Sequence, residues 1–270
     1  MYSFEMMTHA MHKITQTYAF ATTETIGTSC LGKPIYALCI GYGATAIGYN
    51  AAHHANEWLT TPLLMQFVEA YCRFCEENTD YLQRFTLYAI PMVNPDGVEA
   101  VQNGTRPPHW KANARGVDLN SNYPASWETA RQNKHAQGYT QAGAIGYVGE
   151  RPLCEPESSA MVAYTQLRDF ALTLSLHTQG EEIYWRYRHF DPPRAQELAA
   201  NMQNASTYLC VDVPDEASHG GYRDWFIEAF NRPGFTIECG LGVNPLPYED
   251  FDAIYEKVKG ILWAGVDVKD

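Results

Sequence analysis

The sequence has no apolar run of about 18 residues, the length that a membrane-spanning helix requires. Its first residues also lack the basic region and apolar stretch of a secretion signal. No Pro/Ser-rich or low-complexity linker divides the 270 residues, and no internal repeat is visible. These absences argue against membrane spanning and secretion. We therefore expect a cytoplasmic protein with one domain over residues 1–270.

Positive charge is scarce, because 19 Lys and Arg stand against 31 Asp and Glu and leave a net charge of −12. Such a chain repels phosphate backbones and anionic lipid, so we expect no nucleic-acid or membrane partner, whereas substrates that carry an amine are tolerated. Seven cysteines are an odd number for a disulfide framework. Cys72 and Cys75 form a Cys-x-x-Cys, but they lie in a helical pattern without a partner pair and receive no function.

The most informative pattern that is present is a His-x-x-Glu pair, His54 and Glu57, where an extended segment gives way to a helix. Three residues of separation place both side chains on one face, so that an imidazole and a carboxylate can bind one cation. Catalytic zinc takes three protein ligands and leaves one position open for water. Taken alone, the pair is equally compatible with an ordinary helix start.

The ends of two predicted strands supply further candidate residues for the metal site and for catalysis. His177 ends the apolar run 170–176, and Glu238 ends the strand pattern 235–237 just before a glycine-containing turn. Open α/β sheets bind their ligands at the carboxyl edge of the strands. His177 is therefore a candidate third ligand, and Glu238 is a candidate general base.

Hydrophobic periodicity predicts alternating strands and helices. Strands are expected over 34–41, 44–52 and 87–93, and a helix over 57–75 with Asn56 as its N-cap, while Asn94-Pro95-Asp96-Gly97 indicates a turn. Residues 103–152 show little periodicity, and long irregular stretches are usually functional. Further helices are expected over 155–169, 192–209 and 248–264, and residues 219–222 are expected in a loop. The alternation predicts an α/β fold with a mostly parallel sheet.

Taken together, these motifs resemble those of the zinc carboxypeptidase family over almost the whole chain. Within it, the likeness is strongest to bacterial γ-D-glutamyl-L-diamino acid endopeptidases, through residues 110–120, 177–185 and 220–225. The resemblance implies a single α/β domain with a mixed, twisted, roughly eight-stranded sheet flanked by helices. It also implies one Zn²⁺ per chain, held by His54, Glu57 and His177, with Glu238 as the catalytic carboxylate. Tyr222 matches a mobile tyrosine that covers substrate, and Asn120 a substrate-binding residue.

Two positions depart from the family pattern. Ser121 stands where ordinary carboxypeptidases of the family carry an arginine that clamps the terminal carboxylate of the substrate. Losing a bidentate donor there disfavours ordinary C-terminal residues and favours an unusual or internal peptide bond. Lys111 stands where many relatives have the arginine that steadies the oxyanion, and Arg115 is an alternative cation for that task.

Other side chains have weaker support. His53 precedes the candidate ligand His54, and successive strand residues face opposite sides, so a structural role is favoured for His53. His219 is equally compatible with substrate contact and with no role. Arg186 or Arg188 are alternative carboxylate-binding residues. The aromatic side chains around residues 184–190 are more typical of packing on a strand face than of a pocket lining.

The leading hypothesis is a zinc metallopeptidase that cuts the bond between γ-D-glutamate and meso-diaminopimelate or lysine in soluble peptidoglycan fragments. A carboxypeptidase of other specificity, or an N-acyl amino acid deacylase on the same fold, is the alternative. A non-catalytic binding protein is a third, different class, but the presence of all three ligands and Glu238 disfavours it.

Overall fold

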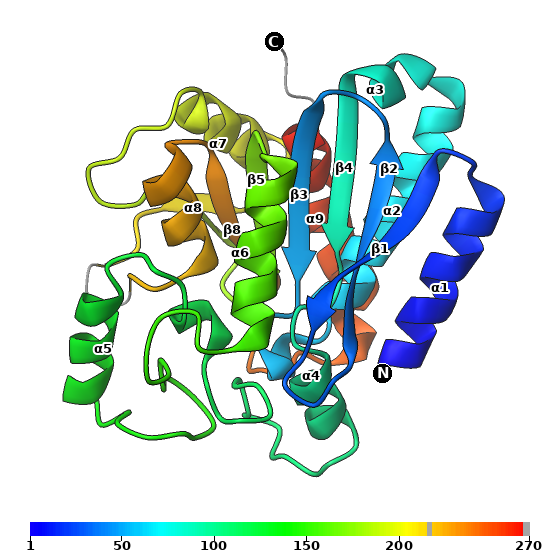
Figure 1. Cartoon of the computed structure of the whole chain (residues 1–270). Coiled ribbons are helices and arrows are strands. Elements are labelled where there is room, and N and C mark those ends of the chain that lie inside the picture. Colours follow the sequence, from blue (N-terminus) through cyan, green and yellow to red (C-terminus); the bar gives the residue numbers. More distant parts are fainter. Residues whose placement is uncertain (215–217, 267–270) are drawn as a thin grey trace.

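The computed structural model describes residues 1–214 and 218–266. Its centre is an eight-stranded sheet with the strand order β1-β2-β4-β3-β5-β8-β6-β7 (Figure 1). The strands are β1 (Ala21–Thr28), β2 (Pro34–Gly41), β3 (Thr45–Ala51), β4 (Phe85–Ile90), β5 (Leu172–His177), β6 (Glu182–Tyr184), β7 (Leu209–Val211) and β8 (Gly234–Glu238). The predicted single α/β domain with a mixed eight-stranded sheet is confirmed.

The middle of the sheet is parallel, because β4, β3, β5 and β8 all run in one direction. Antiparallel strands flank it: β1 and β2 on one side, and β6 on the other. β3 and β5 are almost wholly buried, as parallel strands covered on both faces must be. Their carboxyl ends, with that of β8, therefore meet at one edge of the sheet.

Helices cover both faces of the sheet (Figure 1). On one face, α1, α2, α7 and α9 pack on a large apolar core, and on the other α6 and α8 pack on a smaller one. The helices are α1 (Phe4–Thr17), α2 (Thr60–Glu77), α3 (Thr79–Arg84), α4 (Pro95–Gln102), α5 (Trp127–Ala136), α6 (Pro156–Arg168), α7 (Ala195–Asn204), α8 (Tyr222–Phe230) and α9 (Phe251–Val266). Short 3-10 turns lie at η1 (Ala55–Glu57), η2 (Leu119–Ser121) and η4 (Tyr248–Asp250).

Several predicted elements are corrected by the structure. Asn56 is not an N-cap, because it lies inside η1 and α2 begins only at Thr60. The predicted turn at 94–97 opens α4: the Asn94 side chain accepts a hydrogen bond from the Gly97 amide at 3.1 Å, and Pro95 occupies the first helical turn. The helix predicted over 192–209 is shorter, because α7 ends at Asn204 and β7 follows.

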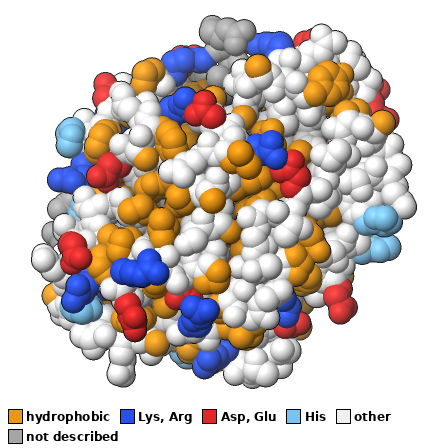
Figure 2. Space-filling view, viewed as in Figure 1, with side chains coloured by type: hydrophobic (Ala, Val, Ile, Leu, Met, Phe, Trp, Pro, Cys, Tyr) orange, Lys and Arg blue, Asp and Glu red, His pale blue; other side chains and the backbone are white. Residues whose placement is uncertain are grey.

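The described residues contain no helix long and apolar enough to cross a membrane. On the face viewed in Figure 2, acidic and basic side chains are interspersed among hydrophobic ones. The net negative charge is therefore not gathered into one patch on that face.

Candidate active site

His54, Glu57 and His177 converge at the carboxyl edge of the sheet, and all three side chains are buried. Nδ1 of His54 lies 2.8 Å from Oε1 of Glu57, and Nδ1 of His177 lies 2.8 Å from Oε2 of the same carboxylate. The two Nδ1 atoms are 3.2 Å apart. The prediction that these three residues come together is thus confirmed.

The local backbone explains how the first two residues reach this position. Ala52 directly follows β3 in the left-handed region, with φ +51°, and its amide donates to the Thr60 hydroxyl at 3.0 Å. The Thr60 hydroxyl in turn donates to the Glu57 carbonyl at 2.7 Å. This turn folds η1 back over the end of the sheet, so that His54 and Glu57 face the end of β5.

Asp118 fixes the orientation of the His54 ring. Its Oδ1 lies 3.1 Å from Nε2 of His54, which therefore carries a proton and leaves Nδ1 to face Glu57 and His177. Burial disfavours a charged imidazole, but the carboxylates of Glu57 and Asp118 outweigh it and raise the pKa of His54 to about 9. The sequence motif 116–120 contains Asp118, but reasoning from sequence assigned it no role.

Lys111 places a positive charge next to the carboxylate of Glu57. Its Nζ lies 3.1 Å from Oε1 of Glu57. Burial favours the neutral form of Glu57, yet the positive charges of His54 and Lys111 hold its pKa well below the usual value. By contrast, burial lowers the pKa of His177, so that ring is neutral at pH 7.

Two imidazoles and one carboxylate whose ligand atoms lie within 4.8 Å of one another form the donor set of a catalytic zinc site. The carboxylate next to Nε2 of His54 is the outer partner that such imidazole ligands commonly have. The residues present therefore fit zinc, with Nδ1 of each ring and the carboxylate of Glu57 as ligands.

Glu238 lies beside this group because β8 is parallel to β5, with Glu238 paired directly to His177 in the register. Its side chain is partly exposed. Burial, reinforced by the negative charge of Glu57, raises the pKa of Glu238 to about 8. A carboxyl group whose pKa lies near neutrality can both accept and donate a proton at pH 7.

A cavity of about 130 Å³ opens next to Glu238. Asn120 and Ser121 from η2 line it, as the predicted substrate-binding roles require. Lys134 from α5 and Arg223 from α8 line it as well. The sequence patterns predict neither cation. α5 has few apolar positions, and Arg223 lies in residues 220–225, for which the family resemblance implies a role only at Tyr222.

Two predicted substrate-binding residues lie elsewhere. Tyr222 is 1% exposed in the core between α8 and the sheet, and its hydroxyl lies 2.8 Å from that of Thr165. Arg115 is half exposed and pairs with Glu155 at 3.8 Å. Neither lines the cavity beside Glu238, and their contacts with substrate stay predictions. Tyr222 is the first residue of α8 and does not lie in a loop, and its ring packs into the core.

His53 and His219 each lie within hydrogen-bond distance of a tyrosine hydroxyl. Nε2 of His53 lies 2.9 Å from the Tyr123 hydroxyl, and its ring stacks on His177. Nδ1 of His219 lies 2.9 Å from the hydroxyl of Tyr187, and His219 also lines the cavity. Arg186 and Arg188 lie outside the cavity that holds Glu238.

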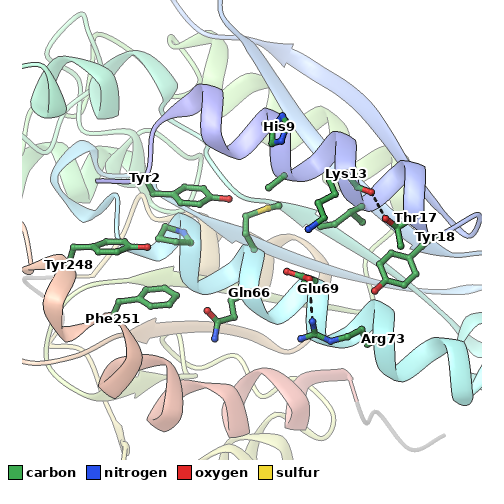
Figure 3. Close-up of a pocket in the computed structure, with 14 residues that line it drawn as sticks. Tyr2, His9, Lys13, Thr17, Tyr18, Gln66, Glu69, Arg73, Tyr248 and Phe251 are labelled. Atoms are coloured by element: carbon green, nitrogen blue, oxygen red, sulfur yellow. Dashed lines mark hydrogen bonds and ion pairs between the residues drawn. The ribbon is translucent and has the colours of Figure 1, made fainter.

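A larger cavity, of about 500 Å³, lies away from these residues, between α1 and α2. Figure 3 shows Tyr2, Tyr248 and Phe251 at one end and the ion pair of Glu69 and Arg73 towards the other. None of its lining residues belongs to the group around Glu57. Glu238, the candidate general base, lines the smaller cavity and not this larger one.

Comparison with known proteins agrees with this geometry. The sequence model of the family described as zinc carboxypeptidase matches residues 7–258. The chain belongs to the zinc carboxypeptidase family. It is accordingly a metallopeptidase with a His-x-x-Glu and His zinc-site motif, for which peptides are the implied substrates and zinc the implied metal.

The relatives differ in their sequence identity to this chain and in how closely their folds match it. The γ-D-glutamyl-L-diamino acid endopeptidase 1 of Lysinibacillus sphaericus is 39% identical over 98% of this chain and 72% of its own length. Bovine thrombin-activatable fibrinolysis inhibitor has the same fold, with a TM-score of 0.80 at 20% identity over 98% of this chain and 95% of that one. The murein-tripeptide amidase of Escherichia coli O157 has a TM-score of 0.59 at 24% identity over 92% and 93%.

Proposed function

We propose that this metallopeptidase hydrolyses the amide bond between γ-D-glutamate and a diamino acid in peptides derived from the bacterial cell wall. The observation that carries the proposal is Ser121, which lines the cavity beside Glu238 and offers no fork-shaped donor there. The identity to an endopeptidase of that name, 39% over nearly the whole chain, supports it. Soluble wall fragments within the cytoplasm are the proposed source of substrate.

The groups at the site have separate roles in the proposed hydrolysis. Zinc, when bound, polarises the scissile carbonyl and lowers the pKa of a bound water towards about 7. Glu238 accepts the proton that the attacking water loses, and returns a proton to the nitrogen as the carbon–nitrogen bond breaks. Lys111 offers its positive charge to the oxygen on which negative charge develops.

The pKa shifts of Glu238 and Glu57 are consistent with separate roles for these two residues. Glu238 lies at the partly exposed edge of the site, where it can reach water, whereas Glu57 is buried and held ionised. Two carboxylates in one site thus have pKa values that are driven in opposite directions, as separate roles for a ligand and a base require.

The test compares matched peptides with the zinc-loaded enzyme. L-Ala-γ-D-Glu-diamino acid tripeptides should be cleaved with a kcat/KM at least about 100-fold above that of the isomers with an ordinary α-L-Glu linkage. The isomers share composition and charge, so a difference reports on the linkage alone. Preference for the α-linked isomers, or for dipeptides with ordinary C-terminal residues, would overturn the proposal.

A further inference from the structure

A second group of side chains with metal-ligating atoms lies outside the cavity beside Glu238. Sγ of Cys30, a carboxylate oxygen of Asp96 and a carboxylate oxygen of Glu157 all lie within 4.8 Å of one another. Cys30 belongs to the turn between β1 and β2, Asp96 to the first turn of α4, and Glu157 to the first turn of α6. None of the three lines the cavity. Three distant parts of the chain thus bring one sulfur and two carboxylates together.

The carboxylate of Asp96 is buried and only partly satisfied. The residue is 3% exposed, and its Oδ2 accepts the Leu31 amide at 2.9 Å. Its Oδ1 is buried and, among the residues that the structure describes, accepts no hydrogen bond. The Lys33 ammonium lies 4.0 Å from Oδ1, beyond hydrogen-bond distance, and is much closer to Glu99, at 2.5 Å. Buried carboxylates are normally paired or bound to a metal, so this oxygen points to a ligand.

Negative charge is in excess around the same group. Glu157 is fully buried, and within residues 1–214 and 218–266 no Lys or Arg forms an ion pair with it. A third buried carboxylate adjoins it, because Nδ2 of Asn113 donates to Oε2 of Glu155 at 2.7 Å and lies 3.4 Å from Oε2 of Glu157. Arg115 pairs with Glu155 alone, at 3.8 Å. A divalent cation between Asp96 and Glu157 balances this excess.

The spacing of the atoms suits zinc. Sγ of Cys30 lies 3.7 Å from Oδ2 of Asp96. Around a tetrahedral zinc, with Zn–S of about 2.3 Å and Zn–O of about 2.1 Å, a sulfur and an oxygen ligand are about 3.6 Å apart. A thiolate favours zinc over Ca²⁺ and Mg²⁺, which take oxygen ligands. Cys30 is half-buried and precedes the exposed Leu31, so that an ion has a route in from solvent.

We propose that Cys30, Asp96 and Glu157 bind a second zinc ion, separate from the one at the catalytic site, with water in the fourth position. Binding releases the thiol proton, because a cysteine ligates as the thiolate. The ion joins the turn between β1 and β2 to the starts of α4 and α6. Its role is structural and does not depend on which peptide the enzyme cleaves.

The ion also stabilises the segment that supports the catalytic site. Asn113 contacts the carboxylate of Glu157 through Nδ2, and its Oδ1 accepts the Val117 amide at 3.1 Å. Lys111 and Asp118, which contact the catalytic zinc ligands, lie in the chain on either side of these two residues. Fixing Glu157 therefore fixes Asn113 and, through it, the loop that carries both.

Metal content tests the proposal directly. After equilibrium dialysis against Zn²⁺, elemental analysis should find two ions per chain in the wild type but one in Cys30→Ala and one in Asp96→Asn. Cys210→Ala, which alters another half-buried cysteine outside the group, is the matched control and should keep two. One ion in the wild type, or two in either Cys30→Ala or Asp96→Asn, would overturn the proposal.

Cobalt identifies the ligands without relying on stoichiometry. Co²⁺ bound by a thiolate has a strong charge-transfer absorption in the near ultraviolet, and the catalytic group of two histidines and a glutamate supplies no sulfur. Both the wild type and His177→Ala, titrated with Co²⁺, should show this band, and Cys30→Ser should lack it. Absence of the band from the wild type would refute the site even if Cys30→Ser does not fold. A band that survives in a folded Cys30→Ser would place the thiolate at another cysteine.

Thermal unfolding measures the structural role. In the His177→Ala background, which lacks a catalytic ligand, added Zn²⁺ should raise Tm by several degrees, because it binds the native state only. The rise should disappear in His177→Ala/Cys30→Ser and persist in His177→Ala/Cys210→Ser. An equal rise in all three proteins would show that zinc acts elsewhere on the chain and would contradict the proposal.

Discussion

Oδ1 of Asp118 lies 3.1 Å from Nε2 of His54, on the side of the ring opposite to Glu57. This contact decides which nitrogen carries the proton and therefore which nitrogen is available to a metal. Removing the carboxylate leaves the ring free to rotate or to change tautomer. Asp118 is thus a positioning residue that acts on metal binding through His54.

Asp118→Ala should lower zinc affinity about 10- to 100-fold, whereas Asp118→Asn, which keeps an acceptor oxygen, should lose less. Competition with a chelator of known affinity measures both. Asp252→Asn in the first turn of α9 is the matched control and should bind zinc as the wild type does. Undiminished affinity in Asp118→Ala would show that the ring is held in place by other contacts.

Zinc affinity should depend on pH in a defined direction. A metal ligand must be a neutral imidazole, but the pKa of His54 in the metal-free protein is about 9. Zinc therefore has to displace a proton below that pH, and its affinity should rise by up to about 10-fold per pH unit between pH 7 and 9, then level off. Chelator competition at pH 7, 8 and 9 measures this slope; a flat profile would mean that His54 is already neutral.

Glu238→Gln should keep zinc and bind peptide, yet lose kcat by about 10²- to 10⁴-fold, because the amide keeps the shape of the side chain but cannot accept the proton. Glu182→Gln is the matched control, since Glu182 lies opposite Glu238 on β6. Steady-state kinetics with measured zinc content distinguish the two variants. A kcat near that of the wild type in Glu238→Gln would move the general base elsewhere.

Ser121→Arg should shift specificity towards peptides with an ordinary C-terminal residue and away from γ-D-glutamyl substrates. A new charged hydrogen bond of about 1.5–3 kcal/mol corresponds to a change of roughly 10- to 150-fold in each direction. Ser121→Ala, which adds no donor, is the control and should keep the original preference. Unchanged rates in the arginine variant would show that residue 121 does not contact substrate.

The zinc ligands could be predicted from sequence because their placement follows from local rules. His54 and Glu57 share one turn, and His177 and Glu238 end parallel strands, whose carboxyl ends necessarily meet. The cations that line the cavity could not be predicted in this way. Arg223 lines it from the second position of α8, and no periodic pattern in the sequence shows which cavity the start of a helix faces.

The errors have equally specific causes. Residues 219–222 are expected in a loop, and the family resemblance implies a mobile Tyr222, yet Tyr222 begins α8 and its ring packs into the core. α5 was missed because only Trp127 and Ala130 are buried on it, so its apolar pattern is too sparse for the helical period to be visible. Asn94 and Pro95 were interpreted as a turn, although an Asx residue followed by proline is also a helix start.

The three candidate zinc ligands, His54, Glu57 and His177, come from parts of the chain that are synthesised at different times. Nδ1 atoms that are 3.2 Å apart belong to histidines separated by 123 positions, and they meet only when β3 and β5 lie side by side in the finished sheet. A nascent chain that ends before β5 has no third ligand to offer. Metal uptake therefore reports on completed tertiary folding, and zinc in excess should draw the folding equilibrium towards the native state.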